Sequence, residues 1–492
     1  MTVHSSFFTT EVLHPQDLAG KNVTVMGLGL FGGGRGLTEA LCRWGARVTV
    51  TDLADEKRLG STLAALGRLP VRFVLGKHRE EDFLGADVVF VNPAVPRTAP
   101  LVRLCRDRDI PIETEMNLFF KLCPGRIAAV TGSNGKTTTT RLLGEMAAAQ
   151  FPRTRLGGNL GRSLLGEVES IRRDDWVVLE LSSFQLEDLA SIRRRPSISL
   201  VTNLSSNHLD RHGTYECYAA AKRVILESPE DGFEGTAWAI LNGGDTRVRS
   251  WAEGLSRRVA YFGCSSGVIP RAAGLWVTPE GDAIARGLPG IAETAPPVLA
   301  AGDLNLRGRF NLINCAGAAA AALAMGVGPD VVRSAARAFK PVPHRLELIH
   351  TEEGVEYYND SIATTPESAI CALEALGPRA ILIAGGYDKG TPFGELGRVI
   401  ARRARAAVLI GKTASAIETA IAAARPKIPI HREATIECAV ERARSLAGPG
   451  DRVLLSPACA SYDMFVNFED RGDRFTRLVR GGRNPVAEST QT

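Results

Sequence analysis

One segment constrains the fold of this chain more than any other: an apolar run that breaks into a glycine-containing loop and then into helix-forming sequence. It covers residues 126–140 and reads RIAAVTGSNGKTTTT. Its glycines allow a tight turn that directs N–H groups at phosphate oxygens, Lys136 can reach terminal phosphates, and Thr137 can offer a hydroxyl to Mg²⁺. The segment predicts a strand, a phosphate-binding loop and a helix. Val130 stands where the standard pattern has Gly, which makes the loop a shortened variant.

Composition narrows the possible classes of protein. The chain has 492 residues, of which 45% are hydrophobic and 23% charged, and this length suits about three soluble domains. The net charge of +5 is spread along the chain, so we expect no nucleic-acid partner. The nine Cys residues lack metal-ligand spacing, which favours reduced thiols in a cytoplasmic protein. No apolar run is long enough to predict a membrane span, and we see no export signal.

The first part of the chain predicts a βαβ unit. Residues 21–29 form an apolar run, residues 38–44 favour a helix, and residues 47–52 suit a second strand. The run ends in GLGLFG, and Asp52 follows Gly32 by twenty positions. That spacing is typical of a dinucleotide site, in which the acid binds a ribose hydroxyl. Extra glycines loosen the fit, so the ligand could be NAD(P) or another diphosphate-bearing molecule.

Alternation of apolar runs and helical stretches continues to the end of the chain. This pattern predicts an α/β protein of three domains: an N-terminal Rossmann-like domain, a central P-loop ATPase-type domain with a mainly parallel sheet, and a C-terminal Rossmann-like domain. Turn-forming segments at Pro124-Gly125 and Pro341-Val342-Pro343 mark the boundaries. The predicted domains are residues 1–125, 126–342 and 343–492.

Polar residues at the ends of apolar runs are candidates for chemistry. Glu180 follows a buried strand beside the phosphate loop, where a second metal ligand is expected. His208 follows the next strand and opens onto the same edge of the sheet. Lys222 lies in a helix and by itself would be taken for a surface lysine. In the third domain, the residues placed to reach a nucleotide or a carboxylate are Arg345, Asp360 and Lys389.

A set of longer motifs resembles the Mur ligases over essentially the whole chain and in the right order. The motifs are TGSNGKTT, GGNLG, LELSSFQLE, NHLDRH with AAK following, GRFNLIN, PHRLE, NDSIATTPES, GGYDKG and LLSPACASYDMFVNFEDRG. The match is closest to the members that add D-glutamate to UDP-N-acetylmuramoyl-L-alanine at the expense of ATP. The resemblance therefore implies a monomeric cytoplasmic ligase of peptidoglycan precursor synthesis that uses ATP, Mg²⁺, glutamate and the UDP-linked substrate.

The resemblance also implies a role for each matched residue. ATP would be bound by Gly132, Ser133, Asn134, Gly135, Lys136, Thr137, Thr138, Asn311, Asn314, Arg345 and Asp360. The UDP-linked substrate and glutamate would be bound by Gly29, Leu30, Phe31, Asp52, Asn159, Ser182, Thr364, Lys389, Ser461 and Phe468. Two Mg²⁺ ions would be held by Thr137, Glu180 and His208. The catalytic residues would be Lys136, His208 and Lys222, with Lys222 carbamylated by carbon dioxide.

Three departures from the family pattern leave more than one function open. Ile362 stands where typical members have Lys, Asn92-Pro93-Ala94 replaces Ser-Pro-Gly, and Phe31 with extra glycines replaces Thr-Gly. The Ile362 variant suits a subgroup that adds L-glutamate. The sequence is also compatible with a ligase of the folylpolyglutamate synthetase type, an NAD(P)-dependent oxidoreductase and a nucleotide-binding protein without catalysis.

The chemistry implied by the resemblance is amide formation from a carboxylate. ATP would phosphorylate the alanyl carboxylate, and the glutamate amine would then displace phosphate from the acyl phosphate. Because both first reactants are anionic, Lys136, Arg345 and magnesium are needed to bring like charges together. Closure of the domains is expected to exclude water from the acyl phosphate.

Overall fold

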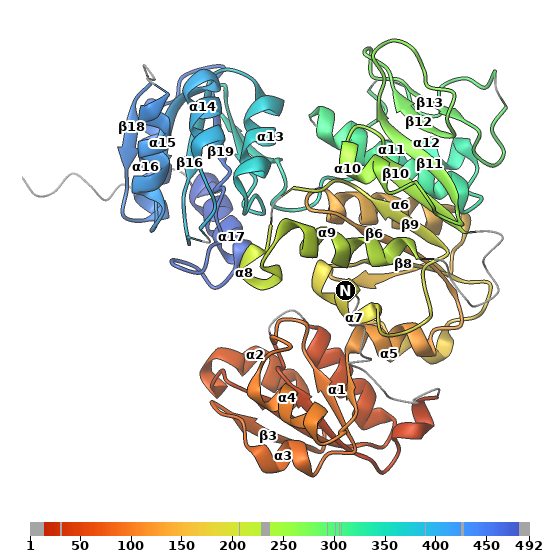
Figure 1. Cartoon of the computed structure of the whole chain (residues 1–492). Helices are drawn as coiled ribbons and strands as arrows, with labels where there is room; N and C mark the ends of the chain where they lie inside the picture. Colours follow the sequence, from red (N-terminus) through yellow and green to blue (C-terminus); the bar gives the residue numbers. More distant parts are fainter. Residues whose placement is uncertain are drawn as a thin grey trace, which may run out of the picture. The chain divides into compact units, whose positions relative to one another are not determined.

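The computed structural model describes residues 14–29, 32–205, 207–227, 237–292, 294–300, 302–304, 306, 308–388, 390–424 and 428–481. These residues fall into two compact units, one comprising Met1–Leu304 with Ile313–Ala338 and the other Asn305–Leu312 with Phe339–Thr492. Among the residues described, no helix is both long and apolar enough to cross a membrane. The sheets confirm the predicted α/β class: three are present, and each is mainly parallel (Figure 1).

The first sheet of unit one has five parallel strands in the order β3-β2-β1-β4-β5. Its strands are β1 (Asn22–Met26), β2 (Arg47–Asp52), β3 (Val71–Leu75), β4 (Val88–Val91) and β5 (Ile112–Glu113). Its helices are α1 (Gly33–Arg43), α2 (Glu56–Leu66), α3 (Glu80–Leu84) and α4 (Pro100–Asp107). The predicted strand over residues 47–52 is confirmed.

The prediction for the first helix was wrong at its start. We expected a helix over residues 38–44, but α1 begins at Gly33 after Gly32, whose φ is 81°. The extra glycines belong to this first turn because the backbone is crowded there: a Cβ on Gly34 would lie 2.1 Å from the Leu28 carbonyl oxygen. A Cβ on Gly32 would lie 2.3 Å from the Gly161 carbonyl oxygen. Packing therefore requires glycine at both positions.

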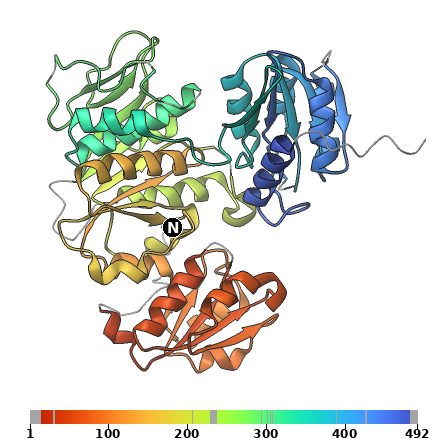
Figure 2. The ribbon, with the colours of Figure 1, turned by 180° about the vertical axis from the view of Figure 1, so that it is seen from behind.

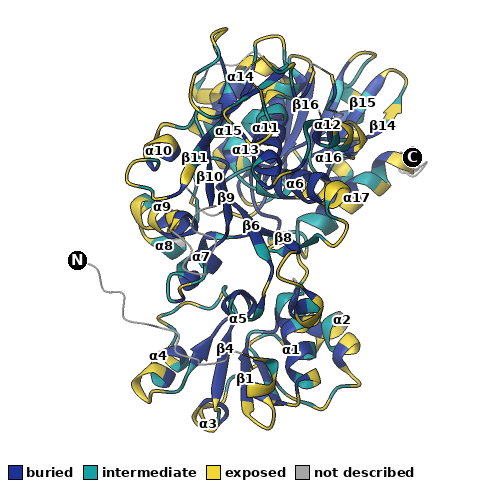
Figure 3. Cartoon of the chain, turned by 90° about the vertical axis from the view of Figure 1, so that its right-hand side faces the viewer, coloured by how far each residue is buried: buried dark blue, intermediate teal, exposed yellow. Residues whose placement is uncertain are grey.

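The second sheet of unit one has eight strands in the order β13-β12-β11-β10-β9-β6-β8-β7, and only β13 is antiparallel to its neighbour. The strands are β6 (Arg126–Thr131), β7 (Arg155–Gly158), β8 (Trp176–Glu180), β9 (Ile198–Val201), β10 (Trp238–Asn242), β11 (Arg258–Cys264), β12 (Gly274–Val277) and β13 (Ala283–Arg286). Buried residues are concentrated in the strands (Figure 3). Burial on both faces explains why these strands read as continuous apolar runs.

Helices cover both faces of this second sheet, as the two opposite views show (Figures 1 and 2). The helix after the phosphate loop, α6 (Lys136–Gln150), packs on β6 and β8 and against α12 (Pro329–Ala338). A separate pair is formed by α7 (Ser183–Leu189) and α9 (Tyr215–Arg223). A helix rich in small residues, α11 (Arg309–Ala324), has buried alanines.

The second unit contains a six-stranded sheet in the order β14-β15-β19-β16-β17-β18, in which only the edge strand β14 is antiparallel. Its strands are β14 (Glu347–Glu352), β15 (Val355–Asn359), β16 (Ala380–Ala384), β17 (Ala404–Leu409), β18 (Ile430–Arg432) and β19 (Arg452–Leu455). Its helices are α13 (Pro366–Leu376), α14 (Gly394–Arg403), α15 (Ala414–Ala423), α16 (Ile436–Leu446) and α17 (Phe468–Arg480). The apolar runs over residues 355–360, 379–386, 406–411 and 451–457 correspond to β15, β16, β17 and β19.

Leu454 tests the packing of this sheet. It is fully buried on the central strand β19, opposite Tyr358 and Leu382 on the neighbouring strands. We expect Leu454→Ala to lower the free energy of unfolding of this unit by about 2–5 kcal/mol, because it removes apolar contacts and leaves a cavity. Leu348→Ala is the matched control, since that side chain is exposed on the edge strand. Urea unfolding measures both, and equal losses would contradict the assigned core.

Candidate active site

The phosphate loop lies between β6 and α6, as predicted. Gly132 has φ 145° and Gly135 has φ 80°, and a Cβ on either would overlap a neighbour: Thr202 Oγ1 at 1.9 Å and Asn314 Oδ1 at 2.3 Å, respectively. The loop therefore has to contain glycine, and Asn314 from α11 packs directly against it. The Lys136 ammonium donates a hydrogen bond to the Ser133 carbonyl oxygen at 2.9 Å, within the loop itself.

Residues after β9 hold this loop in place, and the sequence motifs did not reveal them. The Asn134 amide donates to Asn203 Oδ1 at 2.9 Å, and Thr202 Oγ1 donates to the Asn134 carbonyl oxygen at 2.7 Å. The Ser133 hydroxyl lies 2.8 Å from the Tyr218 hydroxyl. The loop is therefore fixed from the next strand and from α9. Parallel order places these strand ends together, which is the only signal the sequence offered.

Glu180 is buried at the end of β8. Its Oε2 accepts a hydrogen bond from Thr137 Oγ1 at 2.8 Å, and its Oε1 accepts one from Asn159 Nδ2 at 2.8 Å. The carboxylate thus joins the start of α6 to the GGNLG loop. The Thr137 hydroxyl and the Glu180 carboxylate are hard oxygen donors in contact, which suits Mg²⁺ completed by water and phosphate oxygens.

Lys222 is buried on α9, contrary to the surface position that its helix alone suggested. Its Nζ donates to Thr131 Oγ1 at 3.3 Å and lies 4.8 Å from the centre of the Tyr218 ring. Burial lowers the pKa of the Lys222 amine well below its ordinary value, the Lys136 charge lowers it further, and the Glu180 carboxylate opposes both. The amine is therefore readily uncharged, as a nucleophilic lysine must be.

His208 lies in an aromatic cluster that joins α7 to α8 (Leu209–His212). It has φ 53°, and its ring meets the Phe184 ring edge-on, with the ring centres 5.0 Å apart. The His212 ring stacks on Phe184 from 5.3 Å and its Nε2 lies 2.9 Å from Ser183 Oγ. Ser182 caps α7, since its hydroxyl accepts from the Gln185 amide at 3.2 Å. A bound ion at His208 stays a prediction.

Asp52 organises the glycine-containing loop of the first sheet. Its Oδ2 accepts hydrogen bonds from the Leu28 and Gly29 amides at 2.8 and 3.3 Å, and its Oδ1 accepts one from the Ala54 amide at 2.8 Å. The predicted contact between Asp52 and a ligand therefore has to be made by a carboxylate that already binds three backbone N–H groups. Leu30 and Phe31, also predicted here, lie outside the described residues.

In the second unit, Asp360 follows β15 and is buried. Its Oδ1 accepts from the Leu346 amide at 3.0 Å and its Oδ2 from Ser456 Oγ at 2.7 Å. Burial raises the pKa of the Asp360 carboxyl to about 7, although the Ser456 hydrogen bond and the Arg345 charge oppose the shift. The positive charge of Arg345 therefore acts on the Asp360 carboxyl within this unit, whereas the predicted contacts of both residues with ATP stay predictions. Asn311 on α11 is also buried.

A buried arginine connects the loops at the carboxyl edge of this sheet. Arg471 is fully buried, and its guanidinium donates to the hydroxyl and carbonyl oxygens of Ser361 at 3.0 and 2.8 Å and to the Cys459 carbonyl oxygen at 3.2 Å. The Phe468 carbonyl oxygen accepts from Ser361 Oγ at 2.8 Å. These bonds bring together segments that contain the predicted glutamate-binding residues Thr364, Ser461 and Phe468. Lys389 lies outside the described residues.

The described residues contain no group of three or more His, Cys, Asp or Glu side chains that could hold a metal ion. Four cysteine side chains are buried: Cys105, Cys123, Cys315 and Cys459. Unit one therefore contains a phosphate loop, an oxygen-donor pair and a buried lysine, and unit two, taken by itself, contains a set of strand-end loops.

Comparison with known proteins agrees with this arrangement. The Mur ligase middle domain matches residues 130–322, and the Mur ligase, glutamate ligase domain matches residues 344–459. The UDP-N-acetylmuramoylalanine--D-glutamate ligase of Roseiflexus sp. (strain RS-1) is 44% identical over 470 residues, covering 94% of this chain and 99% of that protein. The enzyme of the same name from Symbiobacterium thermophilum is 40% identical over 461 residues, covering 93% and 98%.

Solved structures share the fold. The UDP-N-acetylmuramate-alanine ligase MurC from Thermotoga maritima has a TM-score of 0.63 at 16% identity and covers 94% of this chain and 100% of that chain. A pseudomurein peptide ligase type C from Methanothermus fervidus has a TM-score of 0.59 at 16% identity, with 94% and 100% covered. Identity of 44% along nearly the whole length of a relative, together with the two matching domains, shows that the chain belongs to the Mur ligase family.

Proposed function

We propose that this chain is an ATP-dependent ligase that joins D-glutamate to UDP-N-acetylmuramoyl-L-alanine during peptidoglycan precursor synthesis. The name shared by relatives of 38–44% identity supports this assignment. The observation that carries it is the contact of Thr137 and Glu180 beside a phosphate loop and a buried lysine, since this set suits transfer of a phosphoryl group to a carboxylate. We place the activity in the cytoplasm, in a monomer.

The reaction has two bond-making steps. The alanyl carboxylate oxygen attacks the γ-phosphorus of ATP, the bond to the β-phosphate oxygen breaks, and ADP leaves an acyl phosphate. The amine of D-glutamate then attacks the acyl carbon, loses a proton and expels inorganic phosphate. Backbone N–H groups of the phosphate loop and the Lys136 ammonium would hold the transferred group and offset its charge. The Thr137 and Glu180 oxygens would hold a Mg²⁺ ion, which supplies positive charge at the phosphates.

Lys222 is suited to carbamylation. Its uncharged amine can attack carbon dioxide, and loss of one proton then leaves an N-carboxylate that carries a negative charge. Thr131 and Tyr218 already fix the position of the Nζ atom. We propose that the carbamate oxygens would help to position a magnesium-bound phosphate, and that His208 would help to hold a second Mg²⁺ ion in this family member. Arg345, Asp360 and the strand-end loops of the second unit would bind their own part of ATP and the glutamate.

Phosphate release tests the proposed activity. Purified protein with ATP, Mg²⁺ and UDP-N-acetylmuramoyl-L-alanine should release phosphate with D-glutamate and far less with L-glutamate or no amino acid. Lys136→Ala should lower the rate by about 100-fold or more, because it removes a charge aimed at the transferred phosphoryl group. Lys21→Ala is the control, since Lys21 is exposed at the amino end of β1. A preference for L-glutamate would instead support the variant that Ile362 suggested, and equal rates for Lys136→Ala and wild type would contradict the phosphate-loop assignment.

The Lys222→Ala variant tests whether turnover depends on a carbamate at Lys222. We expect turnover to fall by about 100-fold or more, and added short carboxylates should restore part of it by occupying the emptied space as an anion. Wild-type protein incubated with ¹³C-bicarbonate should show a carbamate carbon signal in NMR that Lys222→Ala lacks. Lys222→Arg is a second variant, because arginine keeps a long basic side chain but its guanidinium stays protonated and cannot form the carbamate. Unchanged turnover in Lys222→Ala would contradict this role.

The raised pKa of the Asp360 carboxyl predicts how the stability of the second unit depends on pH. Its pKa of about 7 in the folded state lies above the value of about 4 expected after unfolding, so the folded state holds the proton longer. The unfolding free energy should therefore fall as pH rises from 4 to 7, by up to about 4 kcal/mol from this group. Asp360→Asn should remove that part of the dependence. Thermal unfolding at pH 4.5 and 8 measures it, and identical pH dependence in both proteins would contradict the expectation.

A further inference from the structure

Residues 92–97, which follow β4, connect the glycine-containing loop of the first sheet to two helices of the second sheet. At one end, Asn92 Nδ2 donates to the Gly27 carbonyl oxygen at 3.2 Å. In the middle, the Ala94 carbonyl oxygen accepts from Arg211 Nη1 on α8 at 3.2 Å. At the other end, Arg97 reaches α7. This segment, which we call the bridge, is thus attached both to the predicted nucleotide loop and to the helices next to Ser182 and His208.

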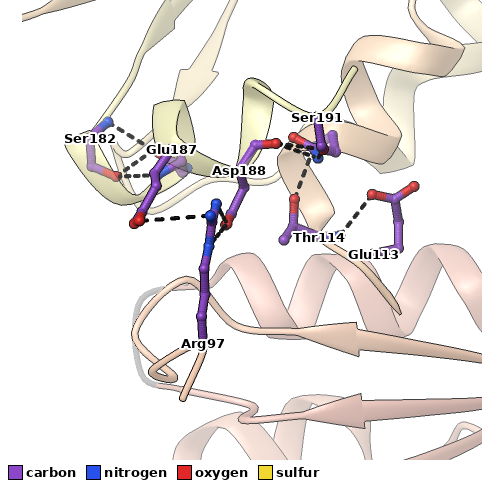
Figure 4. Close-up of polar contacts among 9 residues, drawn as sticks. Arg97, Glu113, Thr114, Ser182, Glu187, Asp188 and Ser191 are labelled. Atoms are coloured by element: carbon purple, nitrogen blue, oxygen red, sulfur yellow. Dashed lines mark hydrogen bonds and ion pairs between the residues drawn. The ribbon is translucent and has the colours of Figure 1, made fainter. Parts of the chain in front are cut away.

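The contact between Arg97 and α7 is the strongest of these three. Arg97 Nη2 and Nε lie 2.6 and 3.2 Å from Asp188 Oδ1, and Arg97 Nη1 lies 3.7 Å from Glu187 Oε1 (Figure 4). The Asp188 side chain is 8% exposed and that of Arg97 27% exposed, so the pair is largely shielded from solvent. A charge-assisted hydrogen bond in such surroundings is short and directional, and it therefore specifies position.

The acidic partner is itself held firmly. The Asp188 carbonyl oxygen accepts from Asn117 Nδ2 at 3.0 Å, and the same amide group donates to Ser191 Oγ at 3.2 Å. Asn117 is fully buried on α5 (Glu115–Leu122), whose first turn is capped by Thr114. Ser182 is the N-cap residue of α7, the helix that carries Asp188 (Figure 4). Arg97 therefore binds a helix that is hydrogen-bonded to α5 and whose N-cap is a predicted substrate-binding residue.

We infer that Arg97 is a positioning residue for the UDP-linked substrate: through Asp188 it fixes the bridge, and hence the glycine-containing loop, relative to Ser182 and the phosphate loop. This inference rests on the proposed function, since it assumes that the glycine-containing loop binds the uridine diphosphate group. The substrate has to meet both sheets at once, so a small shift of the bridge misplaces one end of the molecule relative to the other. Arg97 itself need not touch the substrate.

A purely structural role for Arg97 would affect stability without regard to the ligand. A positioning role instead predicts a selective effect on the UDP-linked substrate. The variants are Arg97→Met, which keeps most of the apolar stem but removes the charge, Asp188→Asn, and the double variant. Arg103→Met on α4 is the matched control, since Arg103 is exposed in the same part of the chain. Asp188→Asn also covers the case in which Arg97→Met fails to fold, because Asn keeps the size of the side chain but removes the negative charge that strengthens the bond to Arg97.

Steady-state kinetics and calorimetric titration with UDP-N-acetylmuramoyl-L-alanine provide the test. In Arg97→Met we expect KM and Kd for this substrate to rise about tenfold or more, with KM for ATP and kcat within about threefold of wild type. The double variant should be no worse than Arg97→Met, because the two residues act as one pair. Arg103→Met should match wild type.

Two results would overturn the inference. One is an unchanged KM and Kd for the UDP-linked substrate in folded Arg97→Met and Asp188→Asn; the proposed function would then stand and the positioning role would fall. The other is equal changes in KM for ATP and for the UDP-linked substrate, which would indicate a general structural role. If wild-type protein neither binds nor turns over the UDP-linked substrate, the proposed function itself fails, and the role of Arg97 falls with it.

Discussion

The central part of unit one depends on a buried carboxylate. Glu180 accepts hydrogen bonds from Thr137 at the start of α6 and from Asn159 in the loop after β7, so three segments meet at one side chain. Without these donors, burial of a charge at this depth would be costly. The arrangement also leaves the carboxylate next to the phosphate loop, where a cation would satisfy it further. The Glu180 carboxylate therefore holds these segments together and is also the group that we propose as a ligand of Mg²⁺.

Much of the fold was predictable because burial on both faces of a parallel sheet leaves a continuous apolar signature. The strand over residues 47–52 matches the sequence-based range at both ends. Short or edge strands such as β7, β14 and β18 were not predicted, since polar and glycine residues dilute their pattern. The start of α1 was not predicted because glycine lowers helix propensity. At Gly34, however, the close approach of the Leu28 carbonyl group leaves no room for a side chain, so the first turn of the helix has to contain glycine there.

The site was predictable only where a residue type implies its chemistry. The phosphate loop and Glu180 followed from the position of strand ends, but the burial of Lys222 did not, because its helix shows no sign of what covers it. The roles of Asn159 and Lys222 came from resemblance to the family. The contacts of Arg97 with Asp188 join residues far apart in sequence and belong to no local pattern, so only the structure could reveal them.

The crowding around α1 changes how its glycine-rich sequence should be understood. Gly32 lies against the backbone of Gly161, and Gly34 against that of Leu28, so any side chain at either position would displace the main chain. The two glycines are therefore required by contacts that exist before any ligand binds. A glycine pattern of this kind records how closely two backbones approach, and it can persist in proteins that bind chemically different nucleotides. The glycine pattern at α1 therefore does not by itself identify the ligand of this loop.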